Sequence, residues 1–278
     1  MTDGPVAVVT GGARGIGRQI AADLLARGYR VVIGDLDEDA TRRTAAELGT
    51  GATGVRLDIT DRALVARTIE HVESVIGPIA VWVNNAGIMP TGAFAGQDVA
   101  LARAVVDVDY AALVEVTAAI LPRFLARDAG TLINVASATG IKPLAGLAAY
   151  SGAKAAVIGF SDALRRELRG TGVRVRVVLP NLVATPMGAG ITPPRLFPAV
   201  TAEQVSAAVV RSIDSGPFAV TVPRALGPLL RIARLLPTAT QDWLDDRIGT
   251  DRIGLGGDPA ARAAYQAGLT VESTDPVA

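Results

Sequence analysis

Short runs of β-branched and other apolar residues alternate with longer segments of helical periodicity along most of this 278-residue chain. The runs that we interpret as strands are 6–10, 30–34, 54–57, 79–83, 131–135, 174–179 and 219–222. The segments that we interpret as helices lie near 15–27, 38–48, 61–76, 97–127, 150–169 and 201–214. Such alternation, with nearly continuous apolar strands, is typical of a parallel sheet covered by helices on both faces. We therefore expect an α/β fold with a doubly wound parallel sheet of about seven strands.

The domain organisation follows from where this pattern ends. No internal repeat, long linker or change of composition appears before about residue 187, which favours a single domain over residues 1–255. The Gly- and Pro-rich segment 187–200 predicts a substrate loop, and 226–248 predicts a short C-terminal helical extension. Weak patterning over 256–278 predicts a loosely ordered tail.

Composition excludes several classes of function. Hydrophobic residues make up 50% of the chain and charged residues 19%, which is enough to bury a large core. The 27 basic and 27 acidic residues give a net charge of +0, so there is no basic footprint for nucleic acid. The chain has no cysteine, and its single histidine, His71, lies on a charged helical stretch. A disulfide framework, a metal site and a histidine-based catalytic triad are therefore not expected.

Neither a signal peptide nor a membrane helix is predicted. The chain runs directly into its first strand-like segment. Its longest uncharged span, 177–194, contains four prolines, which exclude a membrane helix. We expect a soluble, cytoplasmic protein.

A glycine-rich segment, TGGARGIG at 10–17, joins the first predicted strand to the first predicted helix. Glycines there allow a tight turn and a close approach of the backbone to a pyrophosphate, which the helix N-terminus holds. This strand–turn–helix context is that of the dinucleotide site of a Rossmann-type fold. The residues that we expect to bind the cofactor here are Gly11, Arg14, Gly15, Ile16 and Gly17.

Asp35 bears on the choice of cofactor. It ends the second predicted strand, where a carboxylate can bind the adenosine ribose 2′-hydroxyl and would repel a 2′-phosphate. Arg14 favours the opposite choice, since a guanidinium in the glycine loop could bind that phosphate. Because Asp37 adds negative charge nearby, we predict NAD rather than NADP.

Tyr150 and Lys154 lie four residues apart at the start of an apolar helical pattern, so both face one side of the helix. A free phenol has a pKa near ~10, and an ammonium ~4 Å away contributes roughly 4 kcal/mol at an effective dielectric of ~20. We therefore expect Lys154 to lower the pKa of Tyr150 until the phenol can exchange a proton with an alcohol or a carbonyl. Taken alone, the pair also fits an ordinary helix start with a half-buried tyrosine and a solvated lysine.

The glycine spacing, the segment Asn84-Asn85-Ala86-Gly87, and the order Ser137, Tyr150, Lys154 together resemble the short-chain dehydrogenase/reductase family. The likeness covers roughly residues 5–222. It implies an enzyme that transfers a hydride between NAD(H) and a secondary alcohol or ketone. By this resemblance Tyr150 is the general acid/base, Ser137 binds the substrate oxygen, and Lys154 tunes Tyr150 and holds the nicotinamide ribose.

The resemblance also implies the remaining cofactor contacts and an assembly. Positions that match the family's adenine, central-turn and nicotinamide segments are Asp58, Ile59, Asn85, Ala86, Gly87, Pro180, Val183 and Thr185. The family pattern further implies a homodimer or homotetramer built on the long helices near 97–127 and 150–169.

Two positions depart from the family pattern. Asp109 stands where many members carry asparagine, so the side chain loses an amide donor and adds a charge. An aspartate there either supports Lys154 through a proton relay or weakens activity, and the sequence leaves both open. Asn181 follows Pro180 where glycine is usual; this change is mild, because asparagine tolerates left-handed backbone.

The family motifs do not choose a substrate. The substrate loop carries Ile191, Leu196 and Phe197, with Arg195 as its one charge, which favours an apolar pocket and a steroid-, retinoid- or lipid-like alcohol or ketone. The alternatives are an NADP(H)-dependent ketoreductase and a non-catalytic dinucleotide-binding sensor or scaffold. The Leu- and Arg-rich helix near 226–236 predicts a pocket lid, a subunit interface or a membrane-surface contact, and we favour the first two.

Overall fold

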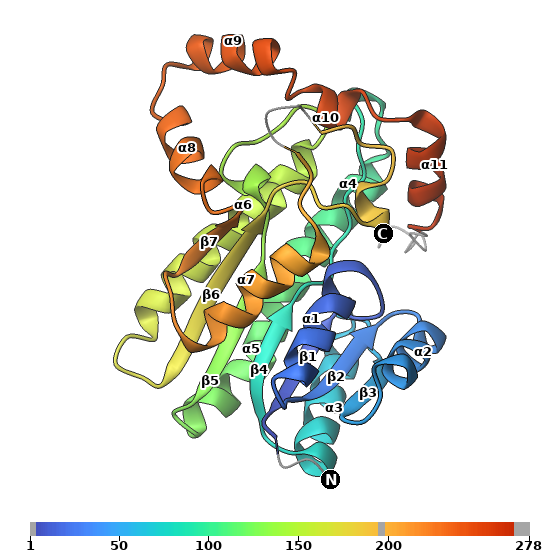
Figure 1. Ribbon diagram of the computed structural model, residues 1–278, viewed down its shortest axis with the longest axis vertical. Helices are drawn as coiled ribbons and strands as arrows, with labels where there is room; N and C mark the ends of the chain where they lie inside the picture. Colours follow the sequence, from blue (N-terminus) through green and yellow to red (C-terminus); the bar gives the residue numbers. More distant parts are fainter. Residues whose placement is uncertain (1–3, 194–197, 270–278) are drawn as a thin grey trace, which may run out of the picture.

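The computed structural model describes residues 4–193 and 198–269, and it confirms the predicted fold. Seven parallel strands form one sheet in the order β3-β2-β1-β4-β5-β6-β7, with helices on both faces (Figure 1). The strands are β1 (Val6–Thr10), β2 (Arg30–Asp35), β3 (Ala52–Arg56), β4 (Ile79–Asn84), β5 (Gly130–Val135), β6 (Val173–Pro180) and β7 (Ala219–Val222). Each lies within two residues of its predicted position.

The helices match the predicted segments and continue beyond them. They are α1 (Gly15–Ala26), α2 (Glu38–Leu48), α3 (Arg62–His71), α4 (Val99–Val106), α5 (Ala112–Ala126), α6 (Ala148–Glu167), α7 (Ala202–Asp214), α8 (Leu226–Ala233), α9 (Thr238–Ile248), α10 (Arg252–Leu255) and α11 (Pro259–Ala267). The long segment predicted near 97–127 is α4 and α5 joined by a π-helical turn, η3 (Asp107–Ala111). π-Helical turns are rare in proteins, and those that occur often lie at functional sites.

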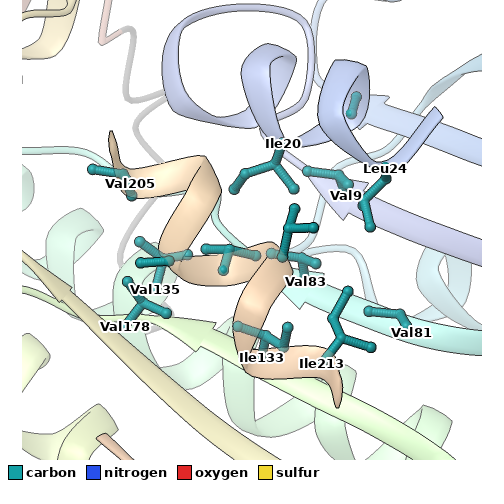
Figure 2. Packing of buried hydrophobic residues seen from close by; sticks show 14 of the residues in the cluster. Val9, Ile20, Leu24, Val81, Val83, Ile133, Val135, Val178, Val205 and Ile213 are labelled. Atoms are coloured by element: carbon teal, nitrogen blue, oxygen red, sulfur yellow. The ribbon is translucent and has the colours of Figure 1, made fainter. Parts of the chain in front are cut away.

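One face of the sheet packs against α1 and α7. Figure 2 shows Ile20 and Leu24 of α1 meeting Val205 and Ile213 of α7 above the apolar side chains of the central strands. Every residue of β1 is buried, as expected for a central strand covered on both faces. This face therefore holds the first helix rigidly behind the glycine-rich loop.

The other face contains a buried polar chain that ties α6 to the sheet. Trp82 donates its indole N–H to Asn84 at 2.9 Å, and Asn84 donates to Asn134 at 2.9 Å. Asn134 in turn donates to Ser161 of α6 at 2.8 Å. Because each polar group in this series has a hydrogen-bond partner, the series makes the packing of α6 on β4 and β5 more rigid rather than weaker.

The C-terminal part differs from its prediction. The tail from residue 256 was expected to be loosely ordered, but Pro259–Ala267 form α11, and Arg262 within it is buried. The residues beyond 269 lie outside the described part of the chain. Figure 1 shows α8 to α11 passing across the end of the molecule that lies away from the N-terminus.

The Leu- and Arg-rich segment forms α8, which packs on β7 through Leu226 and Gly227. Leu229, Ile232 and Leu235 stay exposed, Leu235 by 85%. The helix begins at Leu226, so Pro228 is its third residue, where a missing backbone N–H costs no intrahelical bond. Among the described residues, no helix is long and apolar enough to cross a membrane.

Candidate active site

The glycine-rich loop and the start of α1 make a concave backbone surface. Gly11 has a φ of +60°, and a Cβ on Gly17 would lie 2.1 Å from the carbonyl oxygen of Gly11, so neither position tolerates a side chain. The helices α2, α3 and α4 each begin after an aspartate that accepts a bond from a first-turn amide. In α1 the corresponding residue, Arg14, makes no side-chain cap. An uncapped N-terminus behind two bare glycines fits the pyrophosphate of a dinucleotide.

The segment after β4 holds this loop in place. Asn85 donates from its side chain to the carbonyl oxygens of Thr10, at 2.9 Å, and Gly11, at 3.1 Å. The Thr10 hydroxyl accepts from the backbone N–H groups of Asn85 and Ala86 at 3.0 and 3.1 Å. The Asn85 side chain is therefore committed to the shape of the loop.

Two predicted adenosine contacts lie at the ends of neighbouring strands. Asp35 ends β2, and one of its oxygens accepts from the amide of Ala13 at 3.2 Å, which places the carboxylate beside the glycine-rich loop. Asp58 follows β3 and accepts from the backbone and the hydroxyl of Thr60 in a local turn. Ile59 packs against the apolar core.

The residues predicted for proton transfer meet at the carboxyl end of β5. Ser137 follows that strand and accepts from the amide of Thr139 at 3.2 Å and from its hydroxyl at 3.0 Å. Tyr150 and Lys154 share one side of α6, and the ammonium lies 5.6 Å from the centre of the phenol ring. Both side chains are buried, and Lys154 also donates to the carbonyl oxygen of Val135 at 3.3 Å. The solvated-lysine alternative is therefore wrong.

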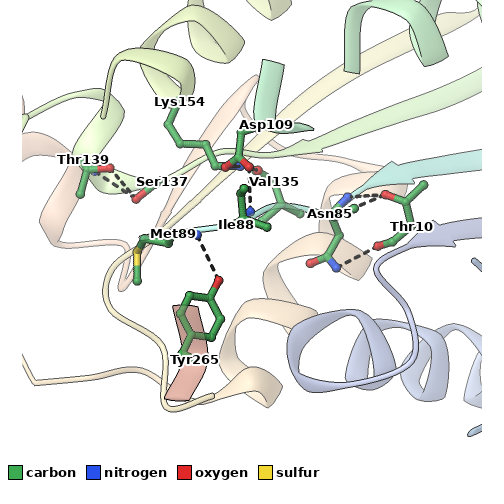
Figure 3. Close-up of polar contacts among 11 residues, drawn as sticks. Thr10, Asn85, Ile88, Met89, Asp109, Val135, Ser137, Thr139, Lys154 and Tyr265 are labelled. Atoms are coloured by element: carbon green, nitrogen blue, oxygen red, sulfur yellow. Dashed lines mark hydrogen bonds and ion pairs between the residues drawn. The ribbon is translucent and has the colours of Figure 1, made fainter. Parts of the chain in front are cut away.

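Asp109 lies directly behind the lysine, as Figure 3 shows. One carboxylate oxygen is 3.2 Å from the Lys154 ammonium, and the other accepts from the amide of Ile88 at 2.7 Å. The Asp109 residue is only 1% exposed and belongs to the π-helical turn. A buried carboxylate here is thus paired with the lysine and with the segment after β4.

This ion pair changes the expected titration of Tyr150. Burial raises the pKa of Tyr150, Lys154 lowers it, and Asp109 raises it, so the pKa lies above its usual value. Burial also raises the pKa of Asp109, against the effect of Lys154. Burial lowers the pKa of Lys154, but Asp109 and Tyr150 outweigh burial and raise it. Lys154 thus lowers the pKa of Tyr150 as predicted, but burial, with a smaller contribution from Asp109, outweighs the lysine, so the predicted net fall toward neutrality is not found.

The predicted nicotinamide segment completes the same edge of the sheet. Pro180 is the buried last residue of β6, Val183 pairs with Val200 in a short bridge, and the Thr185 side chain lies across from Gly15. Leu196 and Phe197 of the substrate loop lie outside the described residues. The predicted site residues thus gather at the carboxyl ends of the strands, where ligands of such folds bind.

Comparison with known proteins decides the family. The model of the family "short chain dehydrogenase" matches residues 5–195. The chain belongs to this family.

Several members of the short-chain dehydrogenase family are similar in sequence. A 1-deoxy-11-beta-hydroxypentalenate dehydrogenase of Streptomyces exfoliatus is 40% identical over 76% of this chain and 80% of its own. A 3-oxoacyl-(acyl-carrier-protein) reductase of Salmonella typhimurium is 32% identical over 66% and 76% of the two chains. A 2,5-dichloro-2,5-cyclohexadiene-1,4-diol dehydrogenase of Sphingobium indicum is 35% identical over 68% and 77%.

Solved structures agree with this assignment. A variant of actinorhodin polyketide ketoreductase, solved with NADPH, has a TM-score of 0.75 at 31% identity and covers 82% of this chain and 98% of its own. A family member from Burkholderia phymatum, solved with NAD, has a TM-score of 0.76 at 24% identity and covers 84% and 94%. The chain is therefore an NAD(P)-dependent oxidoreductase that acts on hydroxyl or keto groups.

Sequence reasoning missed some residues of this short-chain dehydrogenase site. Thr10 organises the glycine-rich loop, and its place at the end of β1 could have suggested that role. Arg262 and Tyr265 of α11 reach the segment after β4, yet they belong to no motif. Their spacing of three on one helix face was the only available signal.

Proposed function

We propose that this enzyme transfers a hydride between NAD(H) and a secondary alcohol or ketone with an apolar body. The observation that carries the proposal is the buried group formed by Tyr150, Lys154 and Asp109 beside Ser137. This group lies at the same edge of the sheet as the glycine-rich loop, whose backbone carries no side chains at its glycines. In its oxidative direction Tyr150 takes the hydroxyl proton of the alcohol, and in reduction it returns a proton to the carbonyl oxygen. Ser137 donates a hydrogen bond to that oxygen as charge develops on it.

Lys154 has two tasks in this proposal. Its ammonium holds the nicotinamide ribose. Its charge lowers the pKa of Tyr150, and Asp109 opposes this effect. The nicotinamide, when bound, supplies or accepts the hydride. The residues Gly11, Gly15 and Gly17 give the dinucleotide a surface without side chains, and Asp35 offers an acceptor to its adenosine ribose.

For the cofactor we propose NAD. The Asp35 carboxylate lies beside the glycine-rich loop, where it would repel a 2′-phosphate. Arg14 is exposed and forms no ion pair among the described residues, so it is the group that would support NADP instead. The relative solved with NADPH keeps that alternative open. Comparison of kcat/KM for the two cofactors, with Asp35→Ala and Arg14→Gln, separates them: wild-type preference for NADP(H) would refute our choice.

For the substrate we propose an apolar secondary alcohol or ketone of the steroid-, retinoid- or lipid-like kind predicted from the sequence. Tyr150 lies in an apolar cluster with Met89, Leu147 and Ile191. Two of the similar enzymes are named for a hydroxypentalenate and a cyclohexadiene-diol, which are hydroxyl-bearing substrates.

The test is a panel of cyclic and long-chain secondary alcohols and ketones, followed by nicotinamide absorbance with wild type and Tyr150→Phe. We expect turnover by the wild type and a loss of about 1,000-fold or more in the variant, with cofactor affinity kept, because the general acid/base alone is removed. Turnover that is unchanged in Tyr150→Phe would refute the mechanism. Tight NAD binding without turnover of any member would favour the sensor or scaffold alternative.

We also propose a homodimer or homotetramer. Val106 of α4 and Leu125 of α5 are apolar and exposed on the helices that family members are expected to pair. Sedimentation equilibrium tests this, and a monomer at micromolar concentration would refute it. A cytoplasmic location stays a prediction.

A further inference from the structure

The last helix, α11, carries a buried cation toward the substrate side of the site. Arg262 is only 5% exposed. It donates to the carbonyl oxygens of Met187 and Ala189, at 2.7 and 3.2 Å, and to that of Met89 at 2.5 Å. It also donates to the Thr91 hydroxyl at 3.0 Å. The guanidinium therefore joins the loop after β6 to the segment after β4.

The positive charge of Arg262 lacks a carboxylate partner. Within the described part of the chain, all of its hydrogen bonds go to backbone carbonyls and a hydroxyl, and it forms no ion pair with an acidic side chain. Burial lowers the pKa of Arg262, yet an arginine stays protonated at any ordinary pH. Buried charges in proteins are usually paired, and no acidic side chain of residues 4–193 and 198–269 forms an ion pair with this one. A carboxylate on a bound ligand would supply such a counter-charge.

Tyr265 lies next to this arginine on the same helix. The Arg262 guanidinium carbon lies 4.7 Å from the centre of the Tyr265 ring. The Tyr265 hydroxyl accepts from the amide of Met89 at 3.1 Å (Figure 3). Ile88, the neighbouring residue, donates its amide to Asp109, so two successive amides connect Tyr265 to the group behind Tyr150. The Tyr265 hydroxyl is therefore fixed to the segment after β4, one residue from the amide that holds Asp109.

The proton of Tyr265 is available to a ligand. Burial raises the pKa of Tyr265, the Met89 amide and Arg262 lower it, and Asp109 and Tyr150 raise it; the balance keeps the phenol protonated at neutral pH. In the described residues no acceptor takes a hydrogen bond from this hydroxyl. Met89, whose amide donates to this hydroxyl, belongs to the apolar cluster around Tyr150. A polar donor in such a lining is the kind of group that orients a ligand.

We propose that Tyr265 and Arg262 determine specificity by selecting substrates that carry a carboxylate on the part of the molecule away from the reacting carbon. Tyr265 donates a hydrogen bond to a carboxylate oxygen, and Arg262 supplies the compensating charge while it holds the two loops together. Neither residue takes part in proton or hydride transfer. This inference rests on the proposed function and adds the chemical class of the substrate to it.

The experiment uses three kinds of alcohol that share one cyclohexane ring: the hydroxycyclohexanecarboxylates, their uncharged methyl esters and cyclohexanol, which lacks the substituent. In the wild type we expect kcat/KM for the acids to exceed that for the esters by about tenfold or more. Tyr265→Phe should lower kcat/KM for the acids by about tenfold, chiefly through KM, and leave cyclohexanol within about twofold. Tyr29→Phe, which removes a phenolic hydroxyl distant from the site, is the matched control and should change none of them.

A binding measurement makes the test independent of turnover. Cyclohexanecarboxylate is titrated into the full-length protein with NADH and followed by ligand NMR, for wild type, Tyr265→Phe and Arg262→Lys. We expect binding to weaken about tenfold in Tyr265→Phe. Arg262→Lys should keep part of the affinity, because it keeps the charge and loses the forked geometry.

The possible outcomes separate the two proposals. Absence of turnover of every alcohol in the wild type, with the acid still bound through Tyr265, would refute the proposed function and support this inference. Equal kcat/KM for acids and esters would overturn the proposed selection for a carboxylate. An equal loss on all three probes in Tyr265→Phe, or unchanged acid binding, would overturn the role of Tyr265.

Discussion

On the proposed cofactor side of the site, the backbone of a single short segment, 10–17, offers the binding surface. On the proposed substrate side, one buried arginine, Arg262, joins loops that are far apart in the chain. The first surface requires glycine, which has no side chain: a Cβ on Gly17 would overlap the backbone. The second depends on a side chain that is present and donates to Met89, Thr91, Met187 and Ala189. A local turn can therefore be recognised from its glycines, while a long-range clamp has no local signature.

The substitution Gly17→Ala tests the cofactor side and should have the largest effect. Its Cβ would lie 2.1 Å from the carbonyl oxygen of Gly11, and backbone cannot move aside cheaply. We expect a loss of about 3 kcal/mol in the free energy of unfolding and at least about 100-fold weaker NAD(H) binding. Chemical denaturation and calorimetric titration measure the two.

Gly159→Ala is the control for that substitution. Gly159 also lies within a helix, α6, but nothing lies within 4 Å of its added Cβ. We expect unchanged cofactor binding and a stability that is equal or higher by up to about 1 kcal/mol, because alanine favours helix. If both variants behave alike, the cofactor surface does not depend on close packing of the backbone.

Arg262→Met tests the substrate side. It leaves the buried carbonyl of Met89 and the partly buried carbonyls of Met187 and Ala189 without this donor, so we expect a loss of about 2–3 kcal/mol in the free energy of unfolding and a large rise in KM for substrate. NAD(H) affinity should stay within about threefold, because the hydrogen bonds of Arg262 go to Met89, Thr91, Met187 and Ala189 and not to the glycine-rich loop. Arg231→Met, on the exposed part of α8, should be neutral within about 0.5 kcal/mol. A comparable loss of cofactor affinity would show that the two sides are coupled.

Glu73→Gln provides a reference away from both sides. Glu73 accepts from Arg123 and Arg127 at 2.8 and 2.7 Å. Burial acts to raise the pKa of Glu73, but the two arginines and the amide of Ile79 outweigh it and lower the pKa. The carboxylate therefore stabilises the fold above its unfolded pKa, and this contribution is lost as the pH falls through its folded pKa.

At neutral pH we expect Glu73→Gln to lower the free energy of unfolding by about 1–2 kcal/mol, with neither ligand affinity changed. The difference from wild type should vanish in acid, as thermal unfolding from pH 7 downward measures. A difference that stays constant or grows in acid would contradict the sign of this pKa change.

Asp109→Asn acts where the two sides meet and should have the smallest effect on energy. Asparagine keeps an acceptor for the Ile88 amide but removes the charge that raises the pKa of Tyr150. With the ammonium of Lys154 no longer neutralised, the rise of alcohol oxidation with pH should move to lower pH, while the maximal rate changes less than about tenfold. Profiles of kcat/KM against pH measure this shift. A profile that stays in place, or moves to higher pH, would show that Asp109 does not govern the phenol.

The fold could be predicted from the sequence because local patterns of apolar residues indicate its strands and helices. Apolar runs such as 6–10 and 131–135 became central strands, and each strand lies within two residues of its prediction. The glycine-rich loop was recognisable for the same reason. The direction of the pKa change of Tyr150 was not, because it depends first on burial and then on Asp109, which lies forty-one residues earlier and meets Lys154 through the π-helical turn.

The sequence by itself determined the layered sheet, the cofactor loop and the identity of the side chains at the proton-transfer site, since each rests on residue type and short-range spacing. Only the tertiary structure decided what surrounds them. It placed a carboxylate behind Lys154, and it turned a weakly patterned tail into a helix that brings Arg262 and Tyr265 to the substrate side. Burial and long-range contact set charge balance and loop position, and neither is encoded in any window of neighbouring residues.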